Sequence, residues 1–290
     1  MSTYTQVREI VMMNLRSVPQ RLGASLVIVI GIAGVVGVLV AMLSMSTGLN
    51  KTLTATGDPN RAIILRGGSN GELASFLDRS AVTLIKQDPA IARHPDGLPF
   101  ASGELIVITE VPRKGQSSGA NVSLRGVEPK GFDIRPELKI LQGRKFKPGL
   151  RELMVGAGAY KQFDGLQVGS KLKFRGSYWD VVGVFETKDA HDSELWADLD
   201  TVQSAFGRSG MSSVVVRLNY SKAFDDLKRR LSADPQLTVD VKTEQDYFSS
   251  QSSGLTSQIG FLTNIVAYIM AFGALFGALN TMYSAVSSRT

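Results

Sequence analysis

Residues 22–45 read LGASLVIVIGIAGVVGVLVAMLSM, a stretch that would be apolar on every face of a helix. It lies within 29 consecutive residues that carry no charge, whereas about 20 helical residues suffice to cross the hydrocarbon core of a bilayer. A helix also bonds its backbone groups within one segment, as lipid requires. The alternatives are a buried core helix and a signal peptide, but signal peptides have shorter apolar cores, and no clear cleavage site follows this one. We therefore predict a membrane helix over residues 22–46.

A second apolar stretch, residues 259–286, reads IGFLTNIVAYIMAFGALFGALNTMYSAV and lies within 42 consecutive uncharged residues. It predicts a second membrane helix. The flanks outside the two helices carry four basic residues and one acidic residue. Since basic residues are retained on the cytoplasmic side, both termini are expected in the cytoplasm, with residues 287–290 as the cytoplasmic end. Residues 47–258 are then expected on the opposite side of the membrane.

Small residues are spaced for close packing in both predicted membrane helices. Ala33, Gly37 and Ala41 recur at every fourth position, and Gly273 and Gly277 form a GxxxG pair. Such faces let two helices approach closely inside lipid. The alternative is that Gly and Ala are simply common in membrane helices. We predict that the two helices pack together through these five residues.

Residues 1–21 show the pattern of a short amphipathic helix at the cytoplasmic surface of the membrane, closed by Pro19. Apolar positions recur at spacings near three and four, opposite polar and basic positions. The helix could contact another protein or act as a passive interfacial anchor. Its apolar and basic positions are Val7, Arg8, Ile10, Val11, Leu15 and Arg16.

The segment between the membrane helices has an ordinary globular composition and begins and ends with similar patterns. Near its start we expect a strand at 62–65, a helix at 73–87 and a strand at 104–111. Near its end we expect a strand at 213–218, a helix at 222–231 and a strand at 238–241. Two such stretches at the borders of one segment predict a lobe of the split βαβ kind.

The residues between these two patterns read as an insertion. Short strands are expected at 151–156, 171–174 and 179–185, with a turn at 175–177 and a helix at 201–206 behind Asp200 as its N-cap. We predict a small β-rich lobe over residues 121–208. The fold class is therefore an α+β membrane protein, in which two transmembrane helices flank a two-lobed extracytoplasmic domain.

The composition excludes several kinds of chemistry. The chain has no Cys, which rules out disulfides, a thiol nucleophile and Cys-based metal sites. The net charge of +6 is divided between the flanks and the central segment, and no basic block with interleaved aromatics appears. Nucleic acid is therefore not an expected partner.

The remaining candidates for catalytic or binding chemistry are weak. Gly156-Ala157-Gly158 begins like a dinucleotide fingerprint, but Lys161 stands where a third small residue belongs. The run 188–194 could hold a hard metal ion or be a solvated acidic loop. His94 and His191 are the only imidazoles, and no nucleophile elbow is present. We predict no catalytic residue, cofactor or metal, although an anchored hydrolase remains a third reading.

Three phrases in the central segment, with the helices around them, resemble the MacB/FtsX-type permeases of ABC transporters. They are LRGVEP at 124–129, LQGR at 141–144 and VVGVF at 181–185. The resemblance covers nearly the whole chain. It implies that residues 47–258 are a periplasmic MacB-like core domain and that the helix at 7–18 lies against the ATPase side. Arg144 would then be a fold residue in a turn.

The resemblance also implies partners and a mechanism. Permeases of this type pair as homo- or heterodimers on cytoplasmic ATP-binding subunits, whose closure moves the membrane helices and thereby the periplasmic domains. They continue past the position of Thr290 with a cytoplasmic coupling helix and two further membrane helices. The chain is therefore expected to be either the N-terminal part of a longer or split permease or a degenerate member of the family.

We predict a multi-pass, non-enzymatic permease subunit of a bacterial inner membrane, in contact with lipid and with a periplasmic partner protein. The alternative is a membrane-anchored periplasmic sensor or adaptor module without transport activity.

Overall fold

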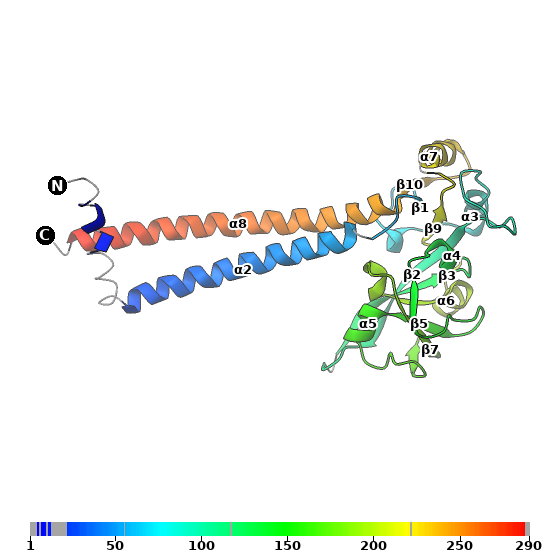
Figure 1. Cartoon of the computed structure of the whole chain (residues 1–290), viewed down its shortest axis with the longest axis horizontal. Coiled ribbons are helices and arrows are strands. Elements are labelled where there is room, and N and C mark those ends of the chain that lie inside the picture. Colours follow the sequence, from blue (N-terminus) through cyan, green and yellow to red (C-terminus); the bar gives the residue numbers. More distant parts are fainter. Residues whose placement is uncertain are drawn as a thin grey trace. The chain divides into compact units, whose positions relative to one another are not determined.

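The computed structural model describes Thr5, residues 7–9, 11–12, 22–54, 56–116, 118–220 and 222–287. These residues divide into two compact units (Figure 1). One unit, Met1–Leu49 with Gly254–Thr290, holds most of two long helices; the other, Asn50–Ser253, is the folded domain.

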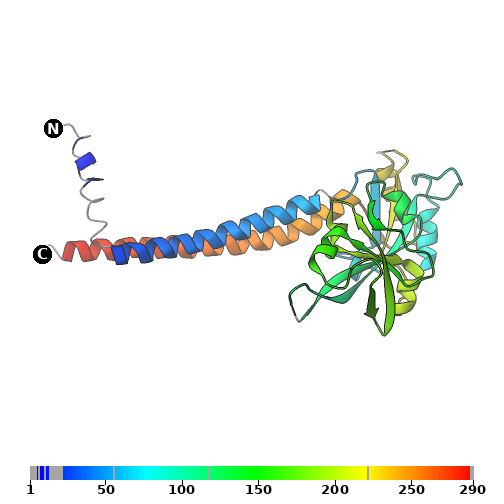
Figure 2. The same cartoon turned by 60° about the horizontal axis from the view of Figure 1, so that its bottom comes forward.

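The two long helices are α2 (Leu22–Thr54) and α8 (Glu244–Ser287), each drawn as an uninterrupted helix in Figures 1 and 2. Within them, Ile32–Leu53 and Ser257–Gly277 are long and apolar enough to cross a membrane. The apolar side chains there are exposed, as Leu43 at 51% and Phe276 at 67% illustrate. A core helix of a soluble protein would bury such side chains, so the exposure disfavours that alternative.

In the described residues of the domain, ten strands form one sheet in the order β10-β1-β9-β2-β3-β8-β5-β7-β4, with β6 paired to β7. The strands are β1 (Arg61–Arg66), β2 (Ala101–Pro112), β3 (Gly119–Val127), β4 (Lys139–Gly143), β5 (Glu152–Gly156), β6 (Lys171–Phe174), β7 (Ser177–Glu186), β8 (Leu195–Asp198), β9 (Ser213–Arg217) and β10 (Val239–Thr243). The helices of the domain are α3 (Arg79–Lys86), α4 (Gly131–Ile134), α5 (Ala157–Gln162), α6 (Leu199–Phe206) and α7 (Ala223–Ala233), with 3-10 turns η2 (Glu72–Ala74) and η3 (Ala190–Ser193).

One half of the sheet has the split βαβ topology that the sequence predicts. Strand β9 lies between β1 and β2 and is antiparallel to both, so β1 and β2 are parallel and α3 connects them. Strand β1 likewise lies between β9 and β10, which α7 connects. Each βαβ unit therefore has a strand of the other unit between its own two strands, as the split arrangement requires.

The inserted segment differs from the prediction of a separate lobe. Strands β2 and β3 pair antiparallel from Glu104 with Val127 to Pro112 with Gly119, and β3 continues in parallel with β8. The sheet therefore runs without a break from the split βαβ half into the insertion. The predicted boundary at residue 121 falls inside β3, because a long hairpin carries the hydrogen bonding across it.

Two helix starts also differ from the prediction. The helix after β8 begins at Leu199, and its N-cap is Asp198, whose side chain accepts from the backbone N of Thr201 at 3.1 Å; Asp200 lies within the helix. The helix predicted at 73–87 is divided into η2 and α3, and Asp78 caps α3 by accepting from Ala81 N at 2.7 Å. An Asp at the N-cap satisfies an unpaired amide of the first turn.

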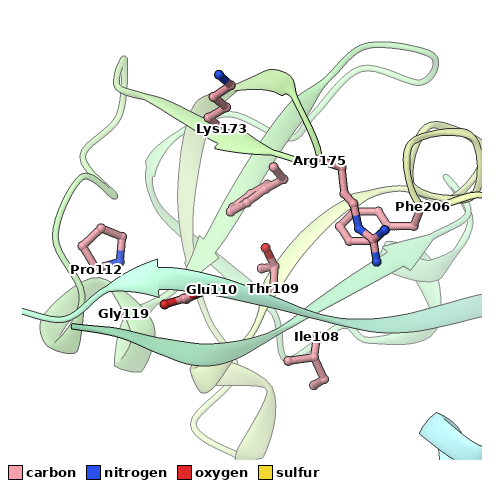
Figure 3. Close-up of a pocket in the computed structure, with 9 residues that line it drawn as sticks. Ile108, Thr109, Glu110, Pro112, Gly119, Lys173, Arg175 and Phe206 are labelled. Carbon is pink, nitrogen blue, oxygen red and sulfur yellow. The ribbon is translucent and has the colours of Figure 1, made fainter.

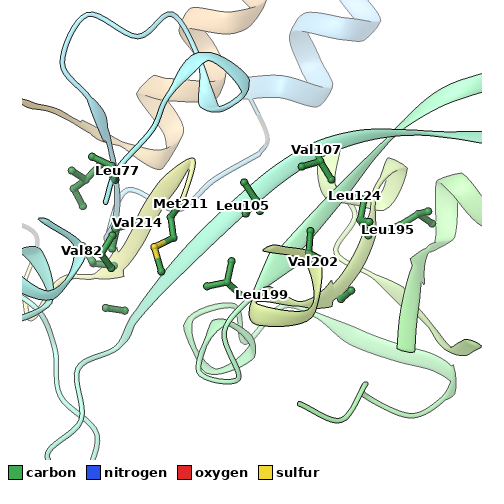
Figure 4. Packing of buried hydrophobic residues seen from close by; sticks show 14 of the residues in the cluster. Leu77, Val82, Leu105, Val107, Leu124, Leu195, Leu199, Val202, Met211 and Val214 are labelled. Atoms are coloured by element: carbon green, nitrogen blue, oxygen red, sulfur yellow. The ribbon is translucent and has the colours of Figure 1, made fainter. Parts of the chain in front are cut away.

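The main apolar core spans both halves of the sheet. Figure 4 shows residues from α6, β2, β3 and β8 packed together, among them Leu105, Leu124, Leu195 and Val202. Helix α6 approaches β3 so closely that a Cβ on Gly126 would lie 3.1 Å from the Cα of Leu199. This spacing is tighter than an ordinary van der Waals contact, so a side chain at position 126 would require α6 or β3 to shift by a few tenths of an ångström.

Candidate functional site

A network of buried charges surrounds the beginning of α8, inside the folded domain. Helix α8 follows β10 directly, and its first residue, Glu244, is 1% exposed. The Glu244 carboxylate accepts from Nε of Arg61 at 2.5 Å and from the backbone N of Asp58 at 3.1 Å. Arg61 also pairs with Glu137 at 2.7 Å. The first turn of α8 is thus held to the start of β1.

Arg61 stays charged despite its burial. Loss of water would lower its pKa, but the attraction of Glu244 and the hydrogen bond to Glu137 outweigh this, and the pKa is raised above its usual value. A second arginine, Arg135, lies 3.7 Å from the other carboxylate oxygen of Glu244. Two guanidinium groups therefore face the first residue of α8.

Arg125 on β3 is the centre of the network and is 2% exposed. Its guanidinium donates to Glu72 at 2.8 Å, to Glu104 at 2.7 Å and to Glu194 at 2.7 Å. Glu104 in turn accepts from Nη1 of Arg135 at 2.6 Å. Through Glu104 and Arg135, the charges of the central strands connect to those at the start of α8.

Two buried glutamates of the network, Glu104 and Glu194, remain ionised. Burial would raise the pKa of Glu104, but Arg135 and Arg125 outweigh it, so the pKa is lowered. The pKa of Glu194 is lowered in the same way, chiefly by Arg125 against the effect of burial. Because removal of charges from water costs several kcal/mol per ion, each member is stable there only while its partners stay in place. A displacement that separates any ion pair of the network would therefore lower the stability of the folded domain.

The turn η3 connects this network to the segment that follows α2. The backbone N of Ala190 donates to Oγ1 of Thr56 at 3.1 Å. The ring of His191 lies edge-on against Phe248 of α8, with centroids 5.5 Å apart. Nδ1 of His191 lies 3.0 Å from the Asp189 carboxylate. The turn thus contacts both the exit of α2 and the first turns of α8.

A family model for the MacB-like periplasmic core domain matches residues 24–234, more than half of the chain. The chain belongs to this family. The match confirms the resemblance to MacB/FtsX-type ABC transporter permeases that the sequence phrases indicate. No curated protein matches the chain.

Solved structures similar to this MacB-like chain include two transporter domains. One is the extracellular domain of the noncanonic ABC-type transporter YknZ from Gram-positive bacteria, which is 14% identical with a TM-score of 0.47 and covers 63% of this chain and 100% of that chain. The other is the periplasmic region of MacB from Actinobacillus actinomycetemcomitans, which is 18% identical with a TM-score of 0.47 and covers 64% of this chain and 90% of that chain.

The sequence-predicted packing residues lie on the long helices and are exposed. Ala33, Gly37 and Ala41 lie on α2, and Gly273 and Gly277 on α8. A Cβ added at Gly37 or Gly273 would meet no atom within 4 Å. The structure thus does not bring these faces together, and their packing stays a prediction.

The predicted interfacial helix is described only in part. Val7, Arg8 and Val11 are helical and exposed, whereas Ile10, Leu15 and Arg16 lie outside the described residues.

Arg144 has a structural role in the MacB-like domain. Its guanidinium donates to both carboxylate oxygens of Glu152, at 2.6 and 2.7 Å. Gly143 beside it has a φ of 71°, and a Cβ there would collide with the carbonyl of Val182. This geometry agrees with the expectation of a fold residue, although Arg144 lies directly after the end of β4 and not in a turn.

The Gly156 and 188–194 motifs are explained by local packing. A Cβ on Gly156 would collide with the carbonyl of Asp192, so the glycine lets η3 approach β5. The Asp192 carboxylate accepts from the backbone N of Thr187 at 2.7 Å and of Lys188 at 3.1 Å. Among the described residues, no group of three or more His, Asp or Glu side chains is placed to hold a metal ion.

A surface groove of about 470 Å³ lies between the tips of the β2–β3 and β6–β7 hairpins (Figure 3). Arg175 lies over the ring of Phe206, 5.6 Å from its centroid, and has a φ of 49° in the predicted turn after β6. Lys173 and Glu110 also line the groove. Its open surface mixes charges of both signs, and this chemistry selects no single class of ligand.

The residues of the buried network could not be predicted from the sequence. Glu72 and Arg125 are 53 residues apart, and no motif of fixed spacing connects them. The one available signal was the presence of isolated charges within strand patterns, such as Glu104 in β2 and Arg125 in β3. A buried charge in a strand indicates a partner, because an unpaired one is too costly.

Proposed function

We propose that this chain is a membrane permease subunit of an ABC transporter, or the N-terminal part of one. On this proposal it transmits the ATP-driven motion of a cytoplasmic partner ATPase to its periplasmic domain. Helices α2 and α8 cross the inner membrane, with both termini in the cytoplasm. Membership of the MacB-like family supports the assignment to transporter permeases.

The observation that carries the mechanical part is the buried pair of Arg61 and Glu244. Helix α8 starts at Glu244 without a loop after β10, so displacement of its first turn acts directly on the sheet. A flexible linker would absorb such motion, whereas a buried ion pair resists separation because each charge would lose its partner away from water.

The expected partners follow from the family. A cytoplasmic ATP-binding subunit supplies the energy, and a second permease chain, identical or different, completes the membrane unit. On this proposal the small-residue faces at Gly37 and Gly273 pack within that unit, and the helix containing Arg8 lies on the ATPase side. The chain itself has no catalytic role.

Membrane topology is the first test. The chain has no Cys, so a single introduced Cys is a unique labelling site. Lys114→Cys, at the exposed tip of the β2–β3 hairpin, should react with a membrane-impermeant maleimide added to spheroplasts. Thr5→Cys should react only after the membrane is opened. Labelling of Lys114→Cys solely in opened cells would refute the periplasmic location.

ATPase coupling is the second test. The full chain is purified in detergent, and ATP hydrolysis is measured with and without the ATP-binding subunit that co-purifies with it. The chain alone should hydrolyse no ATP, and Glu244→Gln should weaken the coupling between hydrolysis and transport while the complex still assembles. Absence of any ATP-binding subunit would favour the alternative of an anchored sensor or adaptor module.

A further inference from the structure

The segment between β1 and α3, residues 67–77, has an unusual distribution of polarity. It reads GGSNGELASFL, and its only charged residue is Glu72. The Glu72 side chain points inward, where it pairs with Arg125 at 2.8 Å and accepts from Oγ of Ser213 at 2.7 Å. The outer surface of this segment, called here the 67–77 loop, is therefore uncharged.

Large apolar side chains lie on that outer surface. Leu73 is 63% exposed and Phe76 is 48% exposed. The residues next to Phe76 are fixed inward: Oγ of Ser75 accepts from Arg66 N at 2.9 Å, and Leu77 N donates to the Met211 carbonyl at 2.8 Å. The loop is thus held in place while Leu73 stays largely in solvent and the Phe76 ring, which lies over Gly210, keeps one side exposed. Such exposed apolar side chains on a fixed loop favour an apolar partner.

The 67–77 loop is bonded to the first turns of α8. Nε2 of Gln251 donates to the Asn70 carbonyl at 2.7 Å, and the Glu72 backbone N donates to the Tyr247 hydroxyl at 3.1 Å. A Cβ on Gly71 would lie 3.3 Å from Nε2 of Gln251. These contacts all belong to the folded domain.

The chain length limits how far this loop can be from the membrane. The candidate span of α8 begins at Ser257, six residues after Gln251. Six residues extend over at most about 20 Å, and over about 9 Å as a helix. Once Ser257 enters the bilayer, Gln251 must lie within this distance of its surface, and Asn70 is farther from it by at most the length of the Gln251 side chain and its 2.7 Å hydrogen bond.

We propose that the 67–77 loop is a lipid-contact surface of the periplasmic domain. Leu73 and Phe76 insert at the boundary between headgroups and acyl chains of the outer leaflet of the inner membrane. The uncharged outer surface fits this location, since apolar side chains of interfacial segments bury about 5–10 Å into that boundary. The inference rests on the proposed membrane crossing by α8.

The test uses single Cys variants labelled with the environment-sensitive dye NBD. Leu73→Cys and Phe76→Cys are placed in vesicles of phosphatidylethanolamine and phosphatidylglycerol, with lipids that carry a nitroxide quencher at shallow or deep positions of the acyl chain. Tyr178→Cys, 61% exposed on β7, is the solvent control, and Tyr268→Cys, 70% exposed within the candidate span, is the membrane control. Emission of the two native tryptophans, Trp179 and Trp196, checks that each variant is folded.

We expect loss of NBD emission with the shallow quencher at positions 73 and 76, and no loss at 178. Quenching at 268 without quenching at 73 or 76 overturns the lipid contact and leaves the membrane crossing intact. Absence of quenching at 268 overturns the crossing and the lipid contact together. Equal quenching at 73, 76 and 178 would also overturn the proposal, because it shows no preference for the loop.

Discussion

Glu244, the first residue of α8, forms a buried ion pair with Arg61, the first residue of β1, across 183 positions of sequence. This pair closes the split βαβ half of the domain at the point where the chain leaves it through α8. A residue that stabilises the fold therefore also controls how α8 is attached to it.

Glu244→Gln should destabilise the domain by about 3–5 kcal/mol, because it leaves Arg61 and Arg135 facing a neutral side chain in a buried site. The measurement is denaturant unfolding of the full chain in detergent, followed through the two buried tryptophans. Asp200→Asn is the control, since the Arg79–Asp200 pair is exposed and worth less than about 1 kcal/mol. Equal effects of both substitutions would contradict the importance of the buried network.

Arg125→Lys should also destabilise the domain although it preserves the charge. A lysine has one ammonium group and cannot make the separate bonds that Arg125 donates to Glu72, Glu104 and Glu194. We expect a loss of about 3 kcal/mol, since bonds between charged groups contribute about 1.5–3 kcal/mol each. An unchanged unfolding midpoint would show that a single positive charge satisfies the three carboxylates.

Stability should fall as the pH rises above the ordinary histidine pKa of 6.5 because of His191. Burial lowers the pKa of this ring, but Asp189 and Glu194 outweigh burial and the repulsion of Arg135, so the pKa is raised above 6.5. The stabilisation by protonated His191 is complete below the unfolded pKa of 6.5 and is lost as pH rises through the folded pKa. His191→Gln should remove this loss of stability with rising pH in unfolding midpoints measured across pH. If the unfolding midpoint of the variant depended on pH in the same way as that of the native chain, the role of His191 would be contradicted.

Acid should destabilise the domain through the buried glutamates. The pKa values of Glu104 and Glu194 lie below the usual 4.5, so their stabilisation is present above that value and is lost as pH falls through the folded pKa values. Glu104→Gln should be less stable than the native chain at neutral pH and show a shallower loss on acidification. The same pH series of unfolding midpoints measures both effects.

Gly57→Ala and Gly68→Ala separate backbone strain from close packing. Both glycines have positive φ, 95° and 79°, so each substitution should cost about 1–2 kcal/mol of conformational strain. A Cβ on Gly57 would also lie 2.8 Å from Gln245 N, whereas a Cβ on Gly68 meets nothing within 4 Å. Gly57→Ala should therefore lose about 1–3 kcal/mol more. Equal losses would show that the chain before β1 can move away from α8.

The fold elements that the sequence predicted are those with a local pattern. The strands at 62–65 and 213–218 follow from short continuous apolar runs, and the strand at 171–174 follows from alternating apolar and polar residues before the predicted turn at 175–177. Strand β4, in contrast, has every residue exposed and therefore shows no alternation to recognise. The two long apolar helices were evident because each contains more than 20 consecutive uncharged residues that are apolar on most faces of a helix.

The sequence alone determined that the chain has two membrane-length apolar helices, a split βαβ pattern between them and no cysteine chemistry, because composition and short-range periodicity carry that information. The tertiary structure decided that the insertion extends the same sheet and that Glu72, Arg125 and Ser213 meet in its interior. It also decided that the 67–77 loop lies against the first turns of α8. Hydrogen bonds and ion pairs between residues 53 to 183 positions apart leave no periodic trace in the sequence, since only folding brings those side chains within reach of each other.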